Sequence, residues 1–340
     1  MSQVQLEKVS GAAEPILEVR DLVVTFEKST GMVRVHKKVI SAVDHVSLNI
    51  FEGEFLALVG ETGSGKTTVA RCLLGVTPPT SGSIRYNGVD ISRFRGRKLR
   101  VYHKEVQFVF QDPFESLLSR HSILGNIAIP IRYLTGEKNP EKIREIAAGL
   151  LVEVGLKPEI MNRYPHQLSG GERQRVNIAR ALASNPKILI ADEPITMLDA
   201  AQRLNILSLL ISLKAKRKLT LLMITHDLAS AVIVSDRILV MYAGKLVESG
   251  PARALFSAPI HPYVELILAS APNIKAPLGS PDEKTTLLSV TAERSSRGCV
   301  FEPRCKYATA ICREVEPPLR EVKASRHAAC HNPLDSQQQE

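Results

Sequence analysis

Residues 56–68, Leu-Ala-Leu-Val-Gly-Glu-Thr-Gly-Ser-Gly-Lys-Thr-Thr, decide the fold of this chain. An apolar run ends at Gly60, a glycine-rich turn follows, and a helical pattern continues to Leu74. The spacing Gly-x-x-x-x-Gly-Lys-Thr between a strand and a helix is that of a phosphate loop. Its backbone N–H groups and the positive end of the following helix attract phosphate oxygens. We therefore predict a nucleoside triphosphate site on an α/β fold.

Two side chains of this loop have definite expected roles. Lys66 would reach the β- and γ-phosphates, and the Thr67 hydroxyl would be a ligand of Mg²⁺. A glycine-rich turn with a chance lysine is the competing interpretation, and the strand before it and the helix after it argue against that. The expected nucleotide-binding residues are Gly60, Glu61, Thr62, Gly63, Ser64, Gly65, Lys66, Thr67 and Thr68.

Length and composition limit the remaining possibilities. A chain of 340 residues suggests about two domains, and a hydrophobic fraction of 44% supplies a sizeable core. No apolar run approaches the roughly 18 residues of a membrane helix. Residues 1–15 lack the apolar centre of a secretory signal. We therefore expect a cytoplasmic chain, unless partners hold it at a membrane.

The chain is basic, with a net charge of +9 and a pI of about 9.3. Much of the excess lies in residues 93–100, Arg-Phe-Arg-Gly-Arg-Lys-Leu-Arg. Contact with anionic lipids or with nucleic acid would use such a stretch. Charge alone does not show whether the stretch binds such a partner or is only exposed to solvent. We interpret it as a solvated loop.

Hydrophobic periodicity predicts an α/β core with a helical insertion. Residues 1–15 are expected to form a loose tail, residues 27–38 a loop, and residues 117–155 amphipathic helices. A helix is also expected at residues 205–213, and a linker at 274–286. The alternation of strands and helices favours a largely parallel sheet. Strands are expected at residues 16–26, at two places within 39–55, and at 83–86, 106–110, 187–192, 219–225 and 237–242.

Several polar residues follow strands of this predicted sheet. Gln111 comes after residues 106–110 and could be a Mg²⁺ ligand or orient a water, although most glutamines are surface residues. Asp192 ends the strand 187–192 and is placed to hold Mg²⁺, while Glu193 could accept a proton from an attacking water. Adjacent carboxylates repel each other unless a cation lies beside them. His226 ends another strand on what should be the same sheet edge, where open α/β sheets bind ligands.

Ser169-Gly170-Gly171-Glu172 supports two interpretations. Ser169 and Glu172 have the spacing of a capping box at a helix start. The same helix start could be a second anion site, which a partner chain would bring to a bound triphosphate. Asp199, in a turn after the strand 187–192, could bind at such an interface or be only a helix cap.

Taken together, these motifs resemble those of an ABC ATPase in order and approximate spacing. The phosphate loop resembles its Walker A motif, Gln111 its Q-loop, residues 168–172 its signature, Asp192 and Glu193 its Walker B motif with the catalytic glutamate, Asp199 its D-loop and His226 its H-loop. Phe26 is similar to the aromatic residue that stacks on adenine. The resemblance covers roughly residues 16–270 and implies catalytic roles for Glu193, His226 and Gln111, with ATP and Mg²⁺ as ligands.

Further stretches resemble the ATPases of dipeptide, oligopeptide and nickel importers, and the turn at residues 78–82 the second (F-type) ATPase of such systems. They are residues 110–117, 163–169 and 261–263. This resemblance implies a second ATPase subunit in a heterodimer, two transmembrane permease subunits and an extracytoplasmic solute-binding protein. It places the chain at the cytoplasmic face of a membrane, with di- or oligopeptides as the expected solute. Related systems move sugars or nickel, so these stay open.

The chain departs from the family pattern at two places. Glu172 stands where glutamine is commoner, and residues 195–199 read Ile-Thr-Met-Leu-Asp rather than the usual Ser-Ala-Leu-Asp form. Both departures leave open whether two paired ATP sites are equally active. A non-transport ABC protein acting on nucleic acid is the rival function. Such proteins usually carry two ATPase modules or long insertions, which this chain lacks, so no nucleic acid is expected.

Four of the five cysteines lie near the C-terminus, with Cys72 alone in the core pattern. Disulfides are not expected in a cytoplasmic chain. A zinc site usually includes a close pair such as Cys-x₂-Cys, which is missing. An iron–sulfur cluster also takes four thiolates, and the resemblance to peptide-importer ATPases implies a 4Fe–4S cluster, with Zn²⁺ as the alternative and four unliganded thiols as the simplest case. The expected ligands are Cys299, Cys305, Cys312 and Cys330.

The expected architecture is therefore a P-loop NTPase core with an antiparallel β subdomain and an inserted helical subdomain. We place a flexible tail at residues 1–15, the ATPase domain at 16–270 with its helical subdomain at about 112–180, and a linker with a cysteine-rich extension at 271–340.

Overall fold

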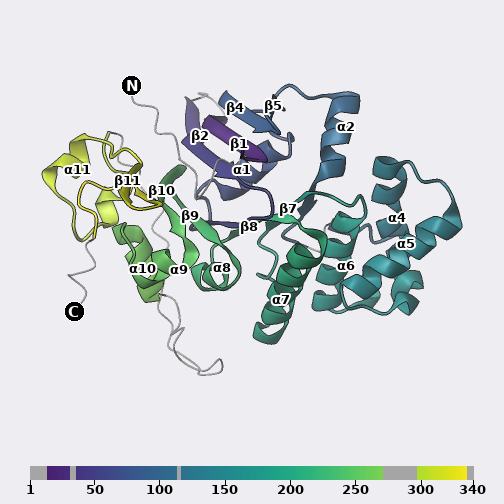
Figure 1. The fold of residues 1–340 in the computed structure, drawn as a ribbon. Coiled ribbons are helices and arrows are strands. Elements are labelled where there is room, and N and C mark those ends of the chain that lie inside the picture. The colour runs from purple at the N-terminus through teal and green to yellow at the C-terminus, as the bar shows by residue number, and fades with distance from the viewer. Residues whose placement is uncertain (1–13, 31–35, 113–115, 271–296, 335–340) are drawn as a thin grey trace.

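The fold is described from a computed structural model, in which residues 14–30, 36–112, 116–270 and 297–334 are described. A small antiparallel sheet, purple in Figure 1, lies above a larger central sheet. Helices of the teal region lie at one end of the molecule, and the yellow C-terminal region lies at the other. The nucleotide-loop helix α1 (Lys66–Leu73) is near the middle.

The elements follow one another as a strand-rich start, a helical middle and a short mixed end. Their bounds are β1 (Leu17–Thr30), β2 (His36–Ile50), β3 (Phe55–Val59), β4 (Ser81–Tyr86), β5 (Val89–Asp90), α2 (Gly96–Glu105), β6 (Val106–Val109), α4 (Ile123–Pro130), η1 (Ile131–Thr135), α5 (Pro140–Glu153), η2 (Pro158–Asn162), η3 (Pro165–Gln167), α6 (Gly170–Leu182), β7 (Ile188–Asp192), α7 (Ala200–Arg217), β8 (Thr220–Thr225), α8 (Leu228–Val234), β9 (Arg237–Tyr242), β10 (Lys245–Pro251), α9 (Ala252–Ser257), α10 (Pro262–Ser270), η4 (Glu302–Arg304), α11 (Ala310–Glu314), β11 (Arg320–Lys323) and β12 (Arg326–Ala328).

The antiparallel sheet has the strand order β2-β1-β4-β5. Alternate residues of β1, such as Leu17 and Val19, are buried, which is the period-two pattern that predicted a strand here. The prediction of a loop at residues 27–38 is wrong at both of its ends. There β1 and β2 continue to pair, from Glu27 opposite Val39 to Thr30 opposite His36. A backbone ladder can hold polar residues in a strand even when their pattern suggests a loop.

The large sheet has the order β11-β12-β10-β9-β3-β8-β7-β6. Its strands β9, β3, β8, β7 and β6 are parallel, as the alternation of strands and helices predicts. All residues of β3, β7 and β8 are buried, since helices and the second sheet cover both faces. Their carboxyl ends are in register, with Val59 opposite Thr225 and Asp192 opposite Ile224.

The helical middle of the chain packs into one core with the large sheet. Helix α5 begins with the side chain of Asn139 as its cap and Pro140 in its first turn. The buried side chains of α4, α5 and α6, among them Ile127, Leu151 and Ile178, belong to a single apolar cluster with residues of the sheet. Helix α6 continues to Leu182, two residues beyond the expected end of this region.

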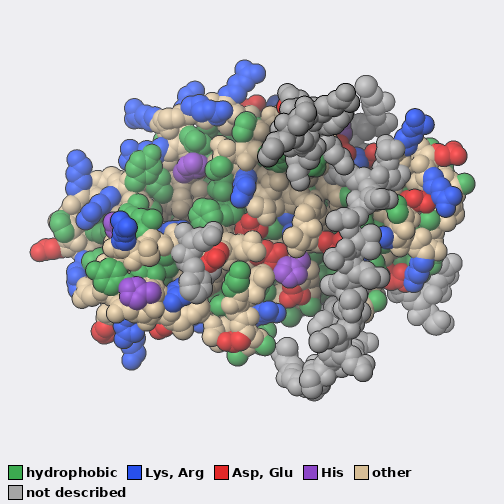
Figure 2. Space-filling model, turned by 180° about the vertical axis from the view of Figure 1, so that it is seen from behind, with side chains coloured by type: hydrophobic (Ala, Val, Ile, Leu, Met, Phe, Trp, Pro, Cys, Tyr) green, Lys and Arg blue, Asp and Glu red, His purple; other side chains and the backbone are tan. Residues whose placement is uncertain are grey.

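The basic stretch at residues 93–100 is only partly a loop, which corrects the prediction. Helix α2 begins at Gly96, so Arg97, Lys98 and Arg100 are on a helix, although their side chains are exposed as expected. The guanidinium of Arg100 lies 4.6 Å from the centre of the Tyr133 ring. On the face shown in Figure 2, Lys and Arg side chains are spread around the rim rather than collected in one patch.

The C-terminal region at residues 297–334 continues the large sheet. Strand β12 pairs with β10, and β11 pairs with β12, so both extend the sheet at the edge opposite to β6. The predicted linker at 274–286 and the first 13 residues of the predicted tail at 1–15 lie outside the described residues. Within the described ranges, none of the helices combines the length and apolar character needed to span a bilayer.

Candidate active site

The candidate active site lies at the carboxyl edge of β3, β7 and β8. The register of these strands brings the phosphate loop after Val59, the carboxylates of Asp192 and Glu193, and His226 to the same edge. Gln111 follows β6, whose Val109 pairs with Ala191 of β7, so it lies at this edge too, with an exposed side chain. Parallel strands present their carboxyl ends together, which is where open α/β sheets bind ligands.

The phosphate loop depends on glycine at two close approaches. A Cβ atom at Gly60 would lie 2.2 Å from the carbonyl oxygen of Met241, and one at Gly65 would lie 2.3 Å from that of Ala42. Gly65 also has a φ of +104°, which favours glycine. The loop therefore lies in close contact with both β9 and β2, so only glycine fits at either position.

Lys66 is 5% exposed and folds over its own loop. Its Nζ donates hydrogen bonds to the carbonyl oxygens of Gly60 (2.7 Å) and Glu61 (2.8 Å). Burial lowers the pKa of Lys66, while the nearby charges of Glu193, Asp192 and Glu61 act in the opposite direction. The ammonium group is thus held at the mouth of the loop, where a triphosphate would offer it stronger acceptors than carbonyls.

Thr67 and Asp192 form an oxygen pair suited to Mg²⁺. The hydroxyl of Thr67 lies 3.4 Å from Asp192 Oδ1. Burial raises the pKa of Asp192, and the Thr67 hydroxyl offsets part of this rise. Because Mg²⁺ prefers hydroxyl, carboxylate and water oxygens, these residues fit the ion.

Glu193 is held by two side chains. Its Oε1 lies 2.9 Å from His226 Nδ1, and its Oε2 accepts a 2.6 Å hydrogen bond from the hydroxyl of Thr196. Burial alone would raise the pKa of Glu193, but these two hydrogen bonds outweigh it and leave the pKa below its usual value. The hydrogen bond to Glu193 raises the pKa of His226. The carboxylate is therefore ionised, and its direction is fixed.

Glu193 also has a left-handed backbone, with a φ of 48°. This conformation is uncommon for a residue other than glycine and occurs preferentially at functional sites. Thr196 was not among the predicted site residues. The only feature of the sequence that could have indicated a role for Thr196 is its place in Ile195-Thr196-Met197, where the family pattern has other residues.

The predicted second anion site begins helix α6. Ser169 Oγ accepts from the N–H of Glu172 (3.3 Å), and Glu172 Oε2 accepts from the N–H of Ser169 (2.9 Å), so the capping box is formed as predicted. A Cβ atom at Gly171 would lie 2.4 Å from Gln202 Oε1, which places this loop against α7. Asp199 caps α7 by accepting from the N–H of Gln202 (2.9 Å).

The hairpin of β1 and β2 brings an aromatic side chain toward the same region. Phe26 is 47% exposed and pairs with Ile40, two residues from Ala42, whose carbonyl lies against Gly65. An exposed phenyl ring near a phosphate loop suits stacking on a base. Its role toward adenine stays a prediction, as do the roles of Thr62, Gly63 and Thr68.

The four C-terminal cysteines come together around one small cavity. Cys299, Cys305, Cys312 and Cys330 all line it, from four separate segments. Burial raises the pKa of the Cys330 thiol to about 12 and also raises those of Cys299 and Cys305. In the described part of the chain, no set of three or more His, Cys, Asp or Glu side chains is arranged to hold a metal ion, so the predicted cluster and the zinc alternative are not confirmed.

The phosphate loop after β3, the acidic pair at the end of β7 and the histidine after β8 define a P-loop ATPase of the ABC type. Comparison with known proteins agrees with this class. Residues 43–196 match the family model described as ABC transporter, and residues 247–312 match the one described as Oligopeptide/dipeptide transporter, C-terminal region.

Curated relatives match along almost the whole chain. The oligopeptide transport ATP-binding protein AppF of Bacillus subtilis (strain 168) is 40% identical, covering 94% of this chain and 97% of its own. The di/tripeptide transport ATP-binding protein DppF of Pseudomonas aeruginosa (strain UCBPP-PA14) is 38% identical, covering 94% and 98%. The chain therefore belongs to the family of ABC transporter ATP-binding proteins.

A solved structure shares the fold of the ATPase core. The ATP-binding cassette MJ0796, in a dimeric post-hydrolysis state bound to ADP and Pi, is 30% identical with a TM-score of 0.62. The match covers 70% of this chain and 99% of that one.

Proposed function

We propose that the chain is the ATP-hydrolysing subunit that powers import of di- or oligopeptides. The observation that carries this proposal is the similarity of residues 247–312 to the C-terminal region of oligopeptide and dipeptide transporters. The same segment contains β10, which pairs with the C-terminal strand β12. Full-length relatives named for peptide transport support the same solute class.

In the proposed reaction, Glu193 accepts a proton from the water that attacks the γ-phosphorus, and His226 holds the carboxylate in place. The bond from the γ-phosphorus to the β–γ bridging oxygen breaks, and ADP leaves with that oxygen. Lys66 moves from loop carbonyls to phosphate oxygens. Thr67 and Asp192 would hold Mg²⁺, with Gln111 as a further ligand, and the ion would neutralise charge on the β- and γ-phosphates.

We further propose that the ATP site is completed by a second ATPase subunit, and that the two subunits form a heterodimer. Ser169, Gly170 and Gly171 of one subunit would meet the triphosphate on the other, with Glu172 turned back into its capping box. Asp199 would lie at the same interface. Two transmembrane permease subunits and an extracytoplasmic solute-binding protein complete the transporter, which places this chain at the cytoplasmic face of the membrane.

Transport in a defined membrane tests the proposal. The chain is purified with the permease and ATPase subunits encoded beside it, reconstituted in proteoliposomes with the matching binding protein, and supplied with labelled tri-alanine. Uptake that requires ATP and stops in a Lys66→Ala variant supports the proposal. Uptake of a disaccharide or of Ni²⁺ instead of tri-alanine would assign the chain to the sugar or nickel alternatives.

The nucleic-acid alternative has a separate measurement. Binding of a 30-mer duplex DNA or RNA that weakens steeply with salt would favour it, because phosphate contacts release counterions.

We also propose that the four-cysteine cavity holds a 4Fe–4S cluster. The donor set fits in type and number, because such clusters take four thiolates. Zn²⁺ is the alternative, because it can also be held by four thiolates. His261 lines the same cavity.

Analysis of the anaerobically purified chain tests the cluster. Four iron and four sulfide per chain, with a brown colour lost in a Cys312→Ser variant, are expected. A Cys72→Ser variant is the matched control, because Cys72 is also buried but lies on α1, away from the four-cysteine cavity. A colourless chain with one zinc would support the alternative, and a metal-free chain would refute both.

A further inference from the structure

One side chain of the C-terminal region reaches directly to the phosphate loop. Arg304, at the end of η4, donates from Nη1 to Glu61 Oε2 (2.9 Å) and from Nη2 to Glu61 Oε1 (3.0 Å). Two parallel hydrogen bonds of this kind give an arginine–carboxylate pair a fixed geometry. Glu61 is the second residue of the phosphate loop, and Arg304 directly precedes Cys305 of the four-cysteine cavity.

Arg304 is held in place by the aromatic residues around it. Its Nη1 also donates to the Tyr242 hydroxyl (3.3 Å), and its guanidinium lies 5.6 Å from the centre of the Tyr242 ring and 5.8 Å from that of Phe301. The side chain is 23% exposed. Because stacked and hydrogen-bonded arginine loses little further freedom on pairing, the guanidinium is ready to receive the carboxylate.

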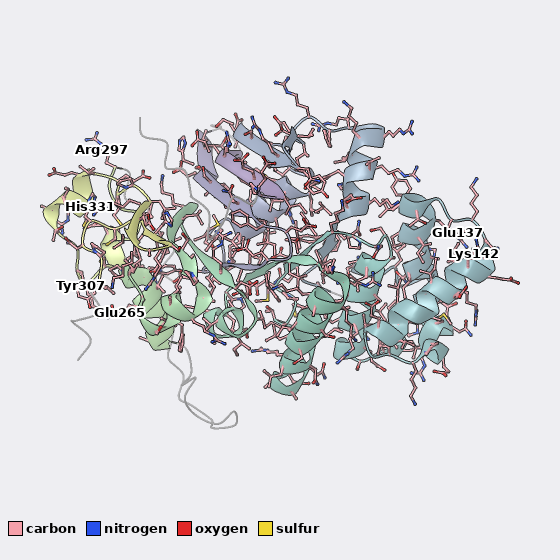
Figure 3. All side chains as sticks on the ribbon, viewed as in Figure 1. Glu137, Lys142, Glu265, Arg297, Tyr307 and His331 are labelled. Carbon is pink, nitrogen blue, oxygen red and sulfur yellow. The ribbon has the colours of Figure 1, made fainter. Side chains whose placement is uncertain are left out.

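The backbone of Glu61 is held from the same side. Its N–H donates to the hydroxyl of Tyr263 (3.1 Å), and the Tyr263 ring packs against those of Tyr242 (4.6 Å between centres) and Phe301 (5.4 Å). Phe301 belongs to the C-terminal region, so the aromatic group joins this region to the loop. The region is itself attached to α10, where the hydroxyl of Tyr307 donates to Glu265 Oε1 (3.2 Å; Figure 3).

The charge of Glu61 acts on the site itself. The Glu61 charge offsets part of the lowering of the Lys66 pKa by burial. The Glu61 carbonyl also accepts a hydrogen bond from Lys66 Nζ. A carboxylate so close to this lysine would repel a triphosphate if it were unpaired. The pair with Arg304 neutralises that carboxylate and turns it toward the C-terminal region.

We propose that Arg304 is a positioning residue for nucleotide binding. Through Arg304, the C-terminal region sets the affinity of the phosphate loop for a nucleoside triphosphate. The inference rests on the proposed ATP site. It does not require that the cysteines bind a metal. It assigns to the C-terminal region an effect on ATP binding, in addition to any structural role.

A charge cycle tests the proposal on the full-length chain. Steady-state hydrolysis and binding of a fluorescent ATP analogue are measured for wild type, Arg304→Gln, Glu61→Gln and the double variant. Arg304→Gln should raise KM and the dissociation constant by about 2- to 5-fold, the range for a partly exposed ion pair, with a smaller change in kcat. The double variant should recover most of this loss, because the unpaired carboxylate is gone.

Two further variants separate charge from folding. Arg304→Lys keeps the charge but loses the double hydrogen bond, so an intermediate KM is expected. Arg313→Gln is the control, because Arg313 pairs with Glu302 (2.9 Å) in the same region and its side chain is 76% exposed. The increase in KM for Arg304→Gln should shrink at high salt, which screens the repulsion.

The outcomes are distinguishable. If Arg304→Gln lowers the melting temperature but leaves KM and the dissociation constant unchanged, Arg304 is only structural and the proposal is refuted. Failure of the double variant to recover affinity would refute the charge mechanism. If wild type binds no ATP analogue, the proposed function fails instead.

Discussion

The carboxyl edge of the central strands and the cysteine-rich region are built on different principles. At the edge, each functional residue follows a buried strand, and the register of β3, β7 and β8 aligns them. In the cysteine-rich region, four short segments meet around a cavity with little regular structure between them. The first arrangement is specified by local pattern, whereas the second depends on contacts between residues far apart in sequence.

The two regions also differ in how charge is stabilised. Glu193 is stabilised by His226 and Thr196 within the site. In the C-terminal region, Arg326 of β12 pairs at 2.8 Å with Glu248 of β10, which has no exposed surface. The edge therefore keeps a charge available for chemistry, while the C-terminal region uses a buried pair to join the end of the chain to the sheet.

Removing the charge of Glu193, the proposed proton acceptor, should have the largest effect. Glu193→Gln keeps the shape but not the proton acceptor, so hydrolysis should fall by about 10²- to 10⁴-fold, while binding of the ATP analogue persists. Glu105→Gln is the control, since Glu105 lies at the amino end of β6 and pairs with Lys187 (3.0 Å). Phosphate release and analogue binding are measured side by side. Near-normal turnover of Glu193→Gln would remove this residue from the mechanism.

Breaking the buried pair should have the next largest effect. Arg326→Met leaves the charge of Glu248 buried and unpaired, and should lower the free energy of unfolding by about 3–5 kcal/mol. Arg20→Met removes a pair with Glu18 whose arginine is 60% exposed, and should cost no more than about 1 kcal/mol. Chemical denaturation measures both.

A double variant sharpens this result. Adding Glu248→Leu to Arg326→Met should recover part of the stability, because the unpaired charge is removed. Recovery should be incomplete, since Glu248 also accepts hydrogen bonds from the N–H groups of Ile260 (3.1 Å) and His261 (2.7 Å). If Arg326→Met is as stable as Arg20→Met, the pair does not anchor the C-terminal region.

Sequence patterns predicted the active-site edge far better than the C-terminal region. The phosphate loop, Asp192, Glu193 and His226 each follow an apolar run, so their strands and their common edge could be inferred locally. Pairing of β12 with β10 could not, because three residues of β12 carry too little pattern and a long segment separates them from β10. The contact of Arg304 with Glu61 joins residues 243 positions apart in the sequence.

Two errors in the predicted secondary structure have a similar cause. The stretch 27–38 was predicted as a loop from its polar residues, and only pairing of β1 with β2 shows that strands continue at 27–30 and 36–38. The stretch at 93–100 has few apolar positions, so helix α2 was not recognised. In both places backbone hydrogen bonds decide the structure, and side-chain periodicity carries no information about them.

The smallest expected effect concerns the pH dependence of the Glu193–His226 pair. The pKa of His226 is raised, so the fold favours its protonated form. This contribution to stability is full below the unfolded value of about 6.5 and is lost as the pH rises through the raised folded pKa. The pKa of Glu193 is lowered, so its contribution is present above about 4.3 and is lost as the pH falls through the folded value.

The pair should therefore stabilise the chain most between these limits. His226→Gln should lower the free energy of unfolding by about 1 kcal/mol or less at pH 6, because half of the histidine side chain is exposed, and by a smaller amount at pH 9. His45→Gln is the control, since His45 contacts Asp21 (2.7 Å) on the surface, where both side chains are more exposed. An equal loss at both pH values for His226→Gln would contradict this prediction, because it would show that a neutral imidazole holds the Glu193 carboxylate.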